Sequence, residues 1–261
     1  MDLSRRASGT KEALPGASRR KKPHFYYNGL QQFLDYAENP RVRCPEMRYL
    51  GGHRRDSGEN DGKKAVCFAP LYNITPGNCL VYSFGISIDW SFDDAIAGYG
   101  CKVFSFDPTI KLPDHKRSDG VHFYNLGIGA ENQTVGSGKN KVRFMSLSGI
   151  MDMLGHTHEI IDYVKLDIES MEAGLIQALT DDPQRLLQIK QLGMEIHPNK
   201  YFHEDFYNLF VSLEYLGFTT FDTRPVLVQE LLFEHPDFPG HNISTCYEMA
   251  FAQVEYSSSS A

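Results

Sequence analysis

Residues 79–107 read CLVYSFGISIDWSFDDAIAGYGCKVFSFD and decide the fold that we expect for the whole chain. The apolar run Leu80–Tyr82 predicts a short buried strand, and Gly85 ends it. Asp93–Ala97 predicts a helix, and Val103–Phe106 predicts a second buried strand. The order strand, loop, helix, strand is typical of a βαβ unit in a parallel sheet.

Gly85 and Asp107 together indicate a nucleotide- or nucleoside-binding site. A glycine at the tip of the first strand lets the backbone approach a ligand closely, and Asp107 follows 22 residues later at the end of the second strand. A carboxylate at that spacing accepts hydrogen bonds from a ribose at the carboxyl edge of a parallel sheet. An ordinary βαβ crossover is the alternative, because the loop has one glycine where dinucleotide sites have three.

Composition and charge exclude several classes of protein. The chain has 261 residues and no apolar run near the roughly 20 residues that a membrane span needs. Residues 1–24 carry seven basic and two acidic side chains, a balance of +5 within a net charge of −7. The remaining chain therefore carries −12, which argues against nucleic acid as a partner.

The chain predicts one folded domain between two tails. Residues 1–24 read as a disordered basic tail, and residues 256–261 as a short Ser-rich tail. Residues 25–255 form the domain, in which Phe25 to Tyr36 predicts an amphipathic helix. Residues 41–78 follow as an irregular segment that covers the sheet.

Beyond residue 120, strands and helices alternate in a way that predicts an α/β fold. The expected strands are 121–126, 161–168, 189–196, 218–221 and 245–254, and the expected helices are 148–154, 171–179 and 206–216. This order implies right-handed crossovers and a mostly parallel, doubly wound sheet. The last strand follows a long Pro-containing loop, and we expect it to be inserted antiparallel at one edge.

Three motifs resemble the FkbM-like S-adenosylmethionine (SAM) methyltransferases, and more closely the group that contains methyltransferase-like protein 24. They are VYSFGIS at 81–87, VFSFDP at 103–108 and DYVKLDIESME at 162–172, the third being the most specific. The resemblance covers roughly residues 40–255. It implies a Rossmann-like doubly wound sheet of seven strands, with SAM at the carboxyl ends of the strands.

The resemblance implies a set of cofactor-binding residues that lie at or just after strand ends. Gly85 corresponds to the glycine of the SAM loop, and Asp107 to the acid that holds the ribose hydroxyls. Many SAM enzymes have an acid where this chain has Ser83, which is a departure from the pattern. The full set is Ser83, Phe84, Gly85, Ser87, Asp107, Ile128 and Gly129, the last two flanking the adenine.

Three further residues are candidates for catalysis. Asp167 is expected beside the methyl donor, as a base or as a residue that orients the acceptor, with a structural turn acid as the alternative. Glu195 and His197 share one face of the next strand. With Asp167 they could hold Mg²⁺ or Mn²⁺, but a hydrogen-bonding pair facing the substrate and simple structural caps are the alternatives.

The predicted function is SAM-dependent methyl transfer, with an oxygen of a small molecule or glycan as the acceptor. The choice of acceptor rests on family analogy only. One alternative is a binding module that kept the fold and lost catalysis, which Ser83 and the sparse glycines would explain. Another is a nicotinamide-dependent oxidoreductase, which the single loop glycine disfavours.

The cysteines predict one disulfide at most. Cys79 and Cys101 lie in apolar strand contexts and read as core residues. Cys44 and Cys67 flank a polar, Gly-rich loop that a disulfide could close.

Compartment is predicted from conflicting signals. Three glycosylation sequons begin at Asn73, Asn132 and Asn242, and with the cysteine pair they favour the secretory pathway. The N-terminus shows no signal peptide, so the cytoplasm is the alternative. The secretory prediction requires bridged Cys44 and Cys67 and exposed sequon asparagines.

Overall fold

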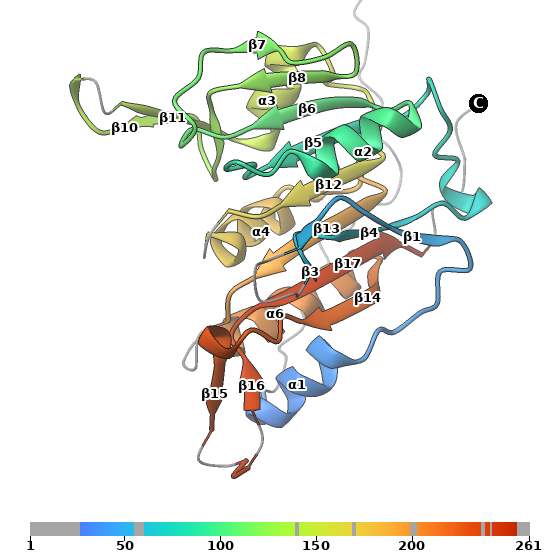
Figure 1. Ribbon diagram of the computed structural model, residues 1–261, viewed down its shortest axis with the longest axis vertical. Coiled ribbons are helices and arrows are strands. Elements are labelled where there is room, and N and C mark those ends of the chain that lie inside the picture. The colour runs from blue at the N-terminus through green and yellow to red at the C-terminus, as the bar shows by residue number, and fades with distance from the viewer. Residues whose placement is uncertain are drawn as a thin grey trace, which may run out of the picture.

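The computed structural model describes residues 27–54, 60–138, 141–168, 171–198, 203–235, 238–240 and 242–254. Within these residues the main feature is an eight-stranded sheet with the strand order β14-β17-β13-β12-β5-β6-β8-β7 (Figure 1). Its strands are β5 (Leu80–Phe84), β6 (Lys102–Phe106), β7 (His115–Lys116), β8 (Val121–Tyr124), β12 (Tyr163–Leu166), β13 (Gln191–Ile196), β14 (Phe218–Pro225) and β17 (Tyr247–Gln253).

The sheet has the mostly parallel, doubly wound topology that the sequence predicts. Strands β8, β6, β5, β12 and β13 pair in parallel, and β17 is antiparallel to both of its neighbours. Two details differ from the prediction. The two-residue strand β7 adds an eighth strand, and β17 lies between β13 and β14 rather than at the edge. The inner position gives β17 a pairing partner on each side, and all seven of its residues are buried.

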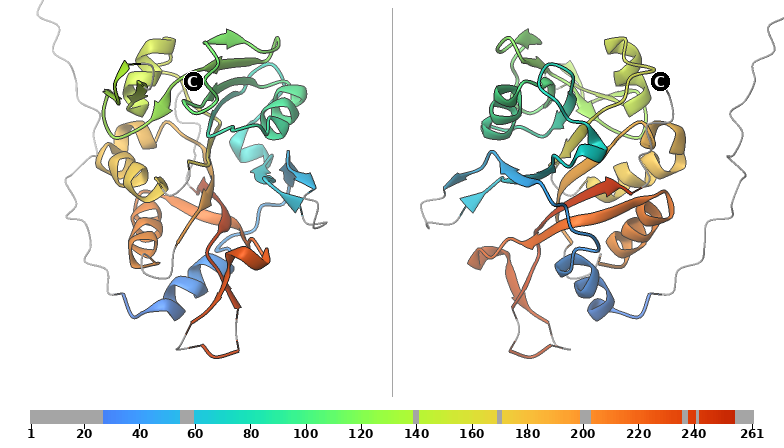
Figure 2. Two further views of the ribbon diagram at one scale, coloured as in Figure 1. Left: turned by 60° about the vertical axis from the view of Figure 1, so that its left-hand side comes forward. Right: turned by 90° about the vertical axis from the view of Figure 1, so that its right-hand side faces the viewer.

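Helices cover both faces of the sheet, together with a two-stranded ribbon of β1 (Met47–Leu50) and β4 (Lys64–Cys67) (Figure 2). Three helices, α3 (Leu147–Leu154), α4 (Glu172–Asp181) and α6 (His203–Tyr215), lie on one face, and α1 (Leu30–Glu38) packs against α6. Helix α2 (Ser91–Tyr99) and the ribbon lie on the other face. The predicted helices are therefore present, with α1 starting five residues later than expected. The short helix α5 (Pro183–Leu186) follows α4.

The segment 41–78 is not irregular as predicted, because it contains the antiparallel ribbon of β1 (Met47–Leu50) and β4 (Lys64–Cys67). All four residues of β4 are buried, and the strand packs on β13 and β17. Three of them, Ala65, Val66 and Cys67, are small or apolar and suit that position. The strand escapes prediction because it is short and begins with a lysine.

Shorter elements complete the chain. Strands β9 (Gly127–Ile128), β10 (Gln133–Val135) and β11 (Val142–Met145) form a small sheet, in which β9 pairs in parallel with β11. The pair β15 (Leu232–Glu234) and β16 (Asn242–Ser244) projects from the sheet near α1 (Figure 1). The antiparallel pair β2 (His53–Arg54) and β3 (Asn60–Asp61) lies between β1 and β4 in the chain.

The structure contains two disulfides, one of them unexpected. Cys44 and Cys67 are bridged with a Cα–Cα distance of 5.8 Å, which confirms the predicted pair. Cys79 and Cys101 are buried, as predicted, but they are also bonded to each other, with a Cα–Cα distance of 4.7 Å. Strand register explains this bond, because Leu80 pairs with Lys102 and so places the two preceding cysteines side by side.

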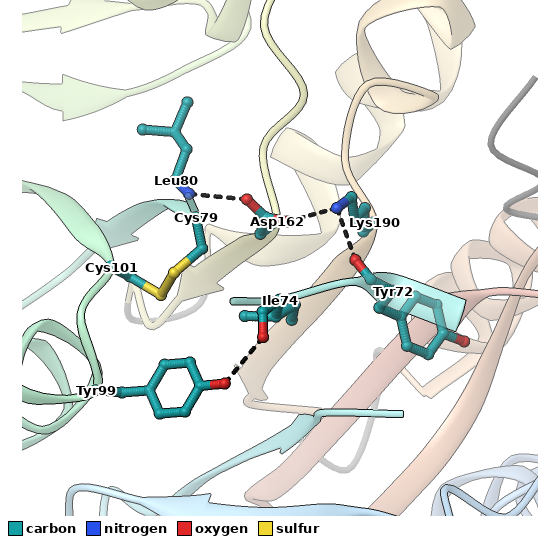
Figure 3. Close-up of a disulfide and its surroundings, with 8 residues drawn as sticks. All are labelled: Tyr72, Ile74, Cys79, Leu80, Tyr99, Cys101, Asp162 and Lys190. Carbon is teal, nitrogen blue, oxygen red and sulfur yellow. Dashed lines mark hydrogen bonds and ion pairs between the residues drawn. A yellow bond between two sulfur atoms is a disulfide. The ribbon is translucent and has the colours of Figure 1, made fainter. Parts of the chain in front are cut away.

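Polar contacts reinforce the amino ends of the strands around this disulfide (Figure 3). The Asp162 carboxylate accepts hydrogen bonds from Leu80 N at 2.8 Å and from Lys190 Nζ at 2.6 Å. Lys190 Nζ also donates to the Tyr72 carbonyl oxygen at 2.7 Å. The disulfide and these bonds fix the amino edge of the sheet, opposite the edge where parallel α/β sheets bind ligands.

All three sequon asparagines, Asn73, Asn132 and Asn242, are exposed, as glycan attachment requires. In the part of the chain that the structure describes, no helix has the length and apolar character to cross a membrane. The tails predicted at 1–24 and 256–261 lie outside the described residues.

Candidate active site

A cavity of about 390 Å³ opens at the carboxyl ends of β5, β6 and β12, a size suited to a small molecule or cofactor. Seven of the predicted site residues line it: Phe84, Gly85, Ser87, Asp107, Ile128, Asp167 and Glu195. Ser83, Gly129 and His197 are not part of its lining. The structure thus gathers most of the predicted residues around one space.

Gly85 brings the loop after β5 against β12. Its φ of +75° is a left-handed conformation, and a Cβ at this position would overlap the carbonyl oxygen of Asp167. Lys165 Nζ donates a hydrogen bond to the Gly85 carbonyl oxygen, and Gly85 N donates to Phe106 O at 3.0 Å. Only glycine fits this close approach, so the loop geometry depends on it.

Asp107 organises the same loop through both of its carboxylate oxygens. Oδ2 accepts hydrogen bonds from the backbone N–H groups of Ile86 at 2.8 Å and Ser87 at 2.7 Å. Oδ1 accepts from the backbone N–H and the hydroxyl of Thr109, at 2.7 and 2.6 Å. Burial raises the pKa of Asp107, but these hydrogen bonds outweigh it and hold the pKa below its ordinary value.

Ser83 lies beneath the loop and not in the cavity. Its hydroxyl donates to Asp93 Oδ2 at 3.3 Å, and the Ser105 hydroxyl donates to Asp93 Oδ1. Asp93 is fully buried on α2, and burial raises its pKa. Sequence reasoning missed Asp93, although an acid next to the buried Phe92 on the apolar face of a helix is a signal for a buried polar contact.

Apolar side chains form the wall of the cavity near β9. Ile128 lines it as predicted, together with Phe106 and Phe144. The neighbouring Gly129 donates from its N–H to Met145 O at 2.9 Å and so belongs to the β9–β11 pairing. The sequence did not predict Phe144 as a cavity residue, because it reaches the cavity only through the parallel pairing of β11 with β9, opposite Gly127.

Asp167 lies between two buried lysines. Lys64 Nζ and Lys165 Nζ are each 3.4 Å from Asp167 Oδ2. Lys64 comes from the covering ribbon, is 1% exposed, and also contacts Glu248 at 2.6 Å and Glu195 at 3.4 Å. Burial lowers the pKa of Lys64, but the three carboxylates outweigh it and raise the pKa well above its ordinary value.

Neither Lys64 nor Glu248 was predicted as part of the site. Glu248 lies on β17 and is 4% exposed, and burial raises its pKa to about 7 although Lys64 opposes this. These two residues are 184 positions apart in the chain, so no local pattern could have joined them. Lys64 and Glu248 form a buried ion pair next to Asp167.

Glu195 and His197 are in contact, with His197 Nε2 at 3.2 Å from Glu195 Oε1. Asp167 does not complete the metal site that the sequence suggested. Among the described residues, the side chain that joins this pair in a group able to hold a metal ion is Cys246, whose Sγ lies 3.3 Å from Glu195 Oε1. Asp167 is instead paired with the lysines.

The ionisation of this group is strongly perturbed. Hydrogen bonds with Cys246, Glu172 and Glu195 raise the pKa of His197 to about 12. Burial raises the pKa of Cys246 to about 12 as well. For Glu195, the contacts with His197 and Lys64 outweigh burial and hold its pKa well below its ordinary value.

Comparisons of the sequence with known proteins found a family model and two relatives. A family model described as "Methyltransferase domain" matches residues 8–230. The human protein "Probable methyltransferase-like protein 24" is 28% identical over 283 residues, covering 95% of this chain and 76% of that protein. Its rat counterpart is 28% identical over 242 residues, covering 86% of this chain and 65% of the rat protein, so this chain spans about two thirds of the latter.

Solved structures show more distant similarity. The methyltransferase FkbM from Methylobacillus flagellatus KT aligns with 67% of this chain and 44% of its own, at 13% identity and a TM-score of 0.38. A putative methyltransferase from Thermoplasma acidophilum aligns with 76% of this chain and 79% of its own, at 13% identity and a TM-score of 0.36.

Proposed function

This chain belongs to the methyltransferase domain family, and we propose that it transfers the methyl group of SAM to an oxygen of a small molecule or glycan. The observation that carries the proposal is the cavity in which the Gly85 loop meets Asp167 at the carboxyl edge of the sheet. This edge is where open α/β sheets bind their ligands. When bound, SAM supplies an activated methyl group on a sulfonium.

The cavity has features that fit such a cofactor. The Gly85 loop leaves no room for a side chain at its closest approach to β12. Phe106, Ile128 and Phe144 offer an apolar wall for a flat base, and Asp107 offers a carboxylate at the same end. We assign the predicted cofactor residues Phe84, Gly85, Ser87 and Asp107 to direct contact, and Ser83 to supporting the loop through Asp93.

For Asp107, ribose binding requires an exchange of hydrogen bonds. A carboxylate has about four acceptor sites, and Asp107 already accepts four hydrogen bonds. Three of the donors are backbone N–H groups that the loop holds in place. The fourth is the Thr109 hydroxyl, which can rotate away, so we infer that a ribose hydroxyl replaces it.

At the acceptor end, Asp167 is the residue that we propose to orient the hydroxyl and to take its proton. Lys64 and Lys165 both contact one carboxylate oxygen, Oδ2, which holds the group in one geometry for an incoming acceptor. Glu195 lines the same cavity and shares Lys64 with Asp167. The two acids can therefore bind an acceptor hydroxyl together.

The test combines SAM titration with turnover by Asp167→Asn. We expect calorimetry to show SAM binding to both forms, and tritiated SAM with a panel of monosaccharides and simple phenols to identify the acceptor. Asp167→Asn should lower turnover about 10²-fold or more, as loss of a general base does, while the melting temperature stays within a few degrees. Asp152→Asn, an exposed acid on α3, is the matched control.

Each contrary result points to one alternative. SAM binding without turnover on any acceptor would favour the binding module. Binding of a nicotinamide dinucleotide in place of SAM would favour the oxidoreductase. Normal turnover by Asp167→Asn would remove the role of this residue but not the activity.

We also infer that the chain matures in an oxidising compartment. Two disulfides and three exposed sequons support this inference, since disulfides are rare in reducing compartments. Expression in a secretory system should give glycosylated protein, seen as a mobility shift after glycosidase treatment. Secreted protein without glycans and with reduced cysteines would contradict the inference.

A further inference from the structure

Glu195, His197 and Cys246 converge between the end of β13 and the start of β17. Their potential ligand atoms all lie within 4.8 Å of one another. Glu195 Oε1 is central, at 3.2 Å from His197 Nε2 and 3.3 Å from Cys246 Sγ. Glu195 lines the cavity, whereas Cys246 is 1% exposed, so the group reaches from the cavity wall into the protein.

The spacing of these atoms matches a tetrahedral metal site. Zinc binds nitrogen and oxygen at about 2.0–2.2 Å and sulfur at about 2.3 Å, so ligand atoms in a tetrahedron lie about 3.3–3.6 Å apart. Two of the three separations, 3.2 and 3.3 Å, are close to this range, and the third is no more than 4.8 Å. An ion could therefore be bound with small side-chain movements.

A fourth residue, Glu172, independently points to an ion. Glu172 is fully buried, and its Oε2 has no hydrogen-bond partner among the described residues. Its Oε1 lies 3.5 Å from His197 Nδ1. A carboxylate on the second ring nitrogen is the usual arrangement behind a metal-bound histidine, because it fixes the ring and its tautomer.

The surrounding charge accommodates a divalent cation. Four carboxylates, those of Asp167, Glu172, Glu195 and Glu248, form one connected cluster with Lys64, Lys165 and His197. Zinc binds a neutral imidazole and a thiolate, so the ion would replace one proton on His197 and one on Cys246. This exchange leaves the net charge of the buried cluster unchanged.

We propose that Glu195, His197 and Cys246 bind a divalent transition-metal ion of the zinc class, with Glu172 orienting His197. A donor set of sulfur, nitrogen and oxygen favours zinc over Mg²⁺, which prefers oxygen ligands alone. Three protein ligands leave a fourth position for water. Metal binding at this group does not depend on methyl transfer.

Cobalt is the probe, because a thiolate bound to Co²⁺ gives a charge-transfer absorption band that carboxylate and imidazole ligands do not. Wild-type protein is treated with a chelator, titrated with Co²⁺, and then challenged with Zn²⁺. We expect the band to appear with one equivalent of Co²⁺ and to disappear as Zn²⁺ displaces it. Cys246 is the free cysteine of the structure, so the band reports on it directly.

Variants locate the ion. Cys246→Ser should lose the band, and Glu172→Gln should bind Co²⁺ about 10- to 100-fold more weakly, as second-shell changes do. His197→Gln should weaken binding by at least as much. His122→Gln is the matched control, because this half-buried histidine lies on β8, four strands from β13, and should bind as wild type does.

The proposal is overturned if the wild type shows no band, or if the band persists in Cys246→Ser. If Cys246→Ser does not fold, His197→Gln decides, and unchanged affinity there overturns the proposal. SAM titration of the chelated wild-type protein separates the two proposals. SAM binding without cobalt binding refutes the metal site alone, and cobalt binding without SAM binding refutes the proposed cofactor alone.

Discussion

Replacing Asp107 with asparagine tests how the cofactor loop is held. The Oδ2 atom accepts two backbone N–H bonds, from Ile86 and Ser87, while Oδ1 accepts from Thr109. Asparagine can accept on one side only, because its other side carries N–H donors. If its oxygen keeps the Thr109 contacts, its amide group faces the two loop N–H groups, and both of those bonds are lost.

The structure gives the size of the effect. A hydrogen bond to a charged group contributes about 1.5–3 kcal/mol, so two of them would sum to about 3–6 kcal/mol. The two bonds share one oxygen and are not independent, so we take the lower end, about 3 kcal/mol. For a chain of this size that corresponds to a fall in melting temperature of about 6–12 °C.

The effect should depend on pH in a defined direction. The folded state lowers the pKa of Asp107 below its ordinary 3.8, so the carboxylate stabilises the fold above that pH. This stabilisation is lost as the pH falls through the folded-state value. Urea denaturation at pH 7 should therefore show the full difference between Asp107→Asn and wild type, and at pH 3 the difference should be smaller.

The control and the refuting result follow from the same contacts. Asp119→Asn removes an exposed acid that pairs only with Lys116 among the described residues, and it should leave stability unchanged. A difference between Asp107→Asn and wild type that stays the same from pH 7 to pH 3 would refute the ionic account. Equal stability at pH 7 would refute the assignment of the loop bonds.

Three further changes test other contacts. Gly85→Ala should weaken SAM binding by about 1–3 kcal/mol because its Cβ overlaps the Asp167 carbonyl, whereas Gly77→Ala, with a similar φ but open space, should not. Lys64→Met should lower the free energy of unfolding, measured by urea denaturation, by about 3–5 kcal/mol, because it leaves buried carboxylates unpaired. The exposed Lys116→Met is the control, and an equally small effect of both changes would argue against a stabilising role of the buried Lys64 ion pairs. The double change Cys79→Ser and Cys101→Ser should lower stability by about 3 kcal/mol, as expected for a 22-residue separation, and leave SAM affinity unaltered; a loss of SAM affinity would show that the disulfide shapes the cavity.

The fold was predictable because its signals are local. Apolar runs such as Leu80–Tyr82 and breakers such as Gly85 mark strands and loops within a few residues, and their order predicts the parallel sheet. The Cys79–Cys101 bond was not predictable in this way. It depends on the register of β5 on β6, which no single strand shows.

The site was predictable only where its residues lie at strand ends. Gly85, Asp107 and Asp167 were found because strand ends of a parallel sheet meet at one edge. Lys64, Cys246 and Glu248 were missed because tertiary packing brings them to the site from the ribbon, from the residue before β17 and from β17 itself. Their residue types alone suggest a solvated lysine, a core cysteine and an exposed acid.

The buried position of Lys64 has a practical consequence for any attempt to trim this protein. The β1–β4 ribbon that carries Lys64 lies upstream of the first strand of the parallel sheet and is not part of that sheet. The Cys44–Cys67 disulfide links the ribbon to the segment before it. Yet Lys64 supplies half of the ammonium charge next to Asp167. A shortened version starting at residue 79 would keep the complete parallel sheet and should still accumulate as insoluble or inactive material. The minimal unit for expression therefore begins before Cys44, in an environment that allows the Cys44–Cys67 disulfide to form.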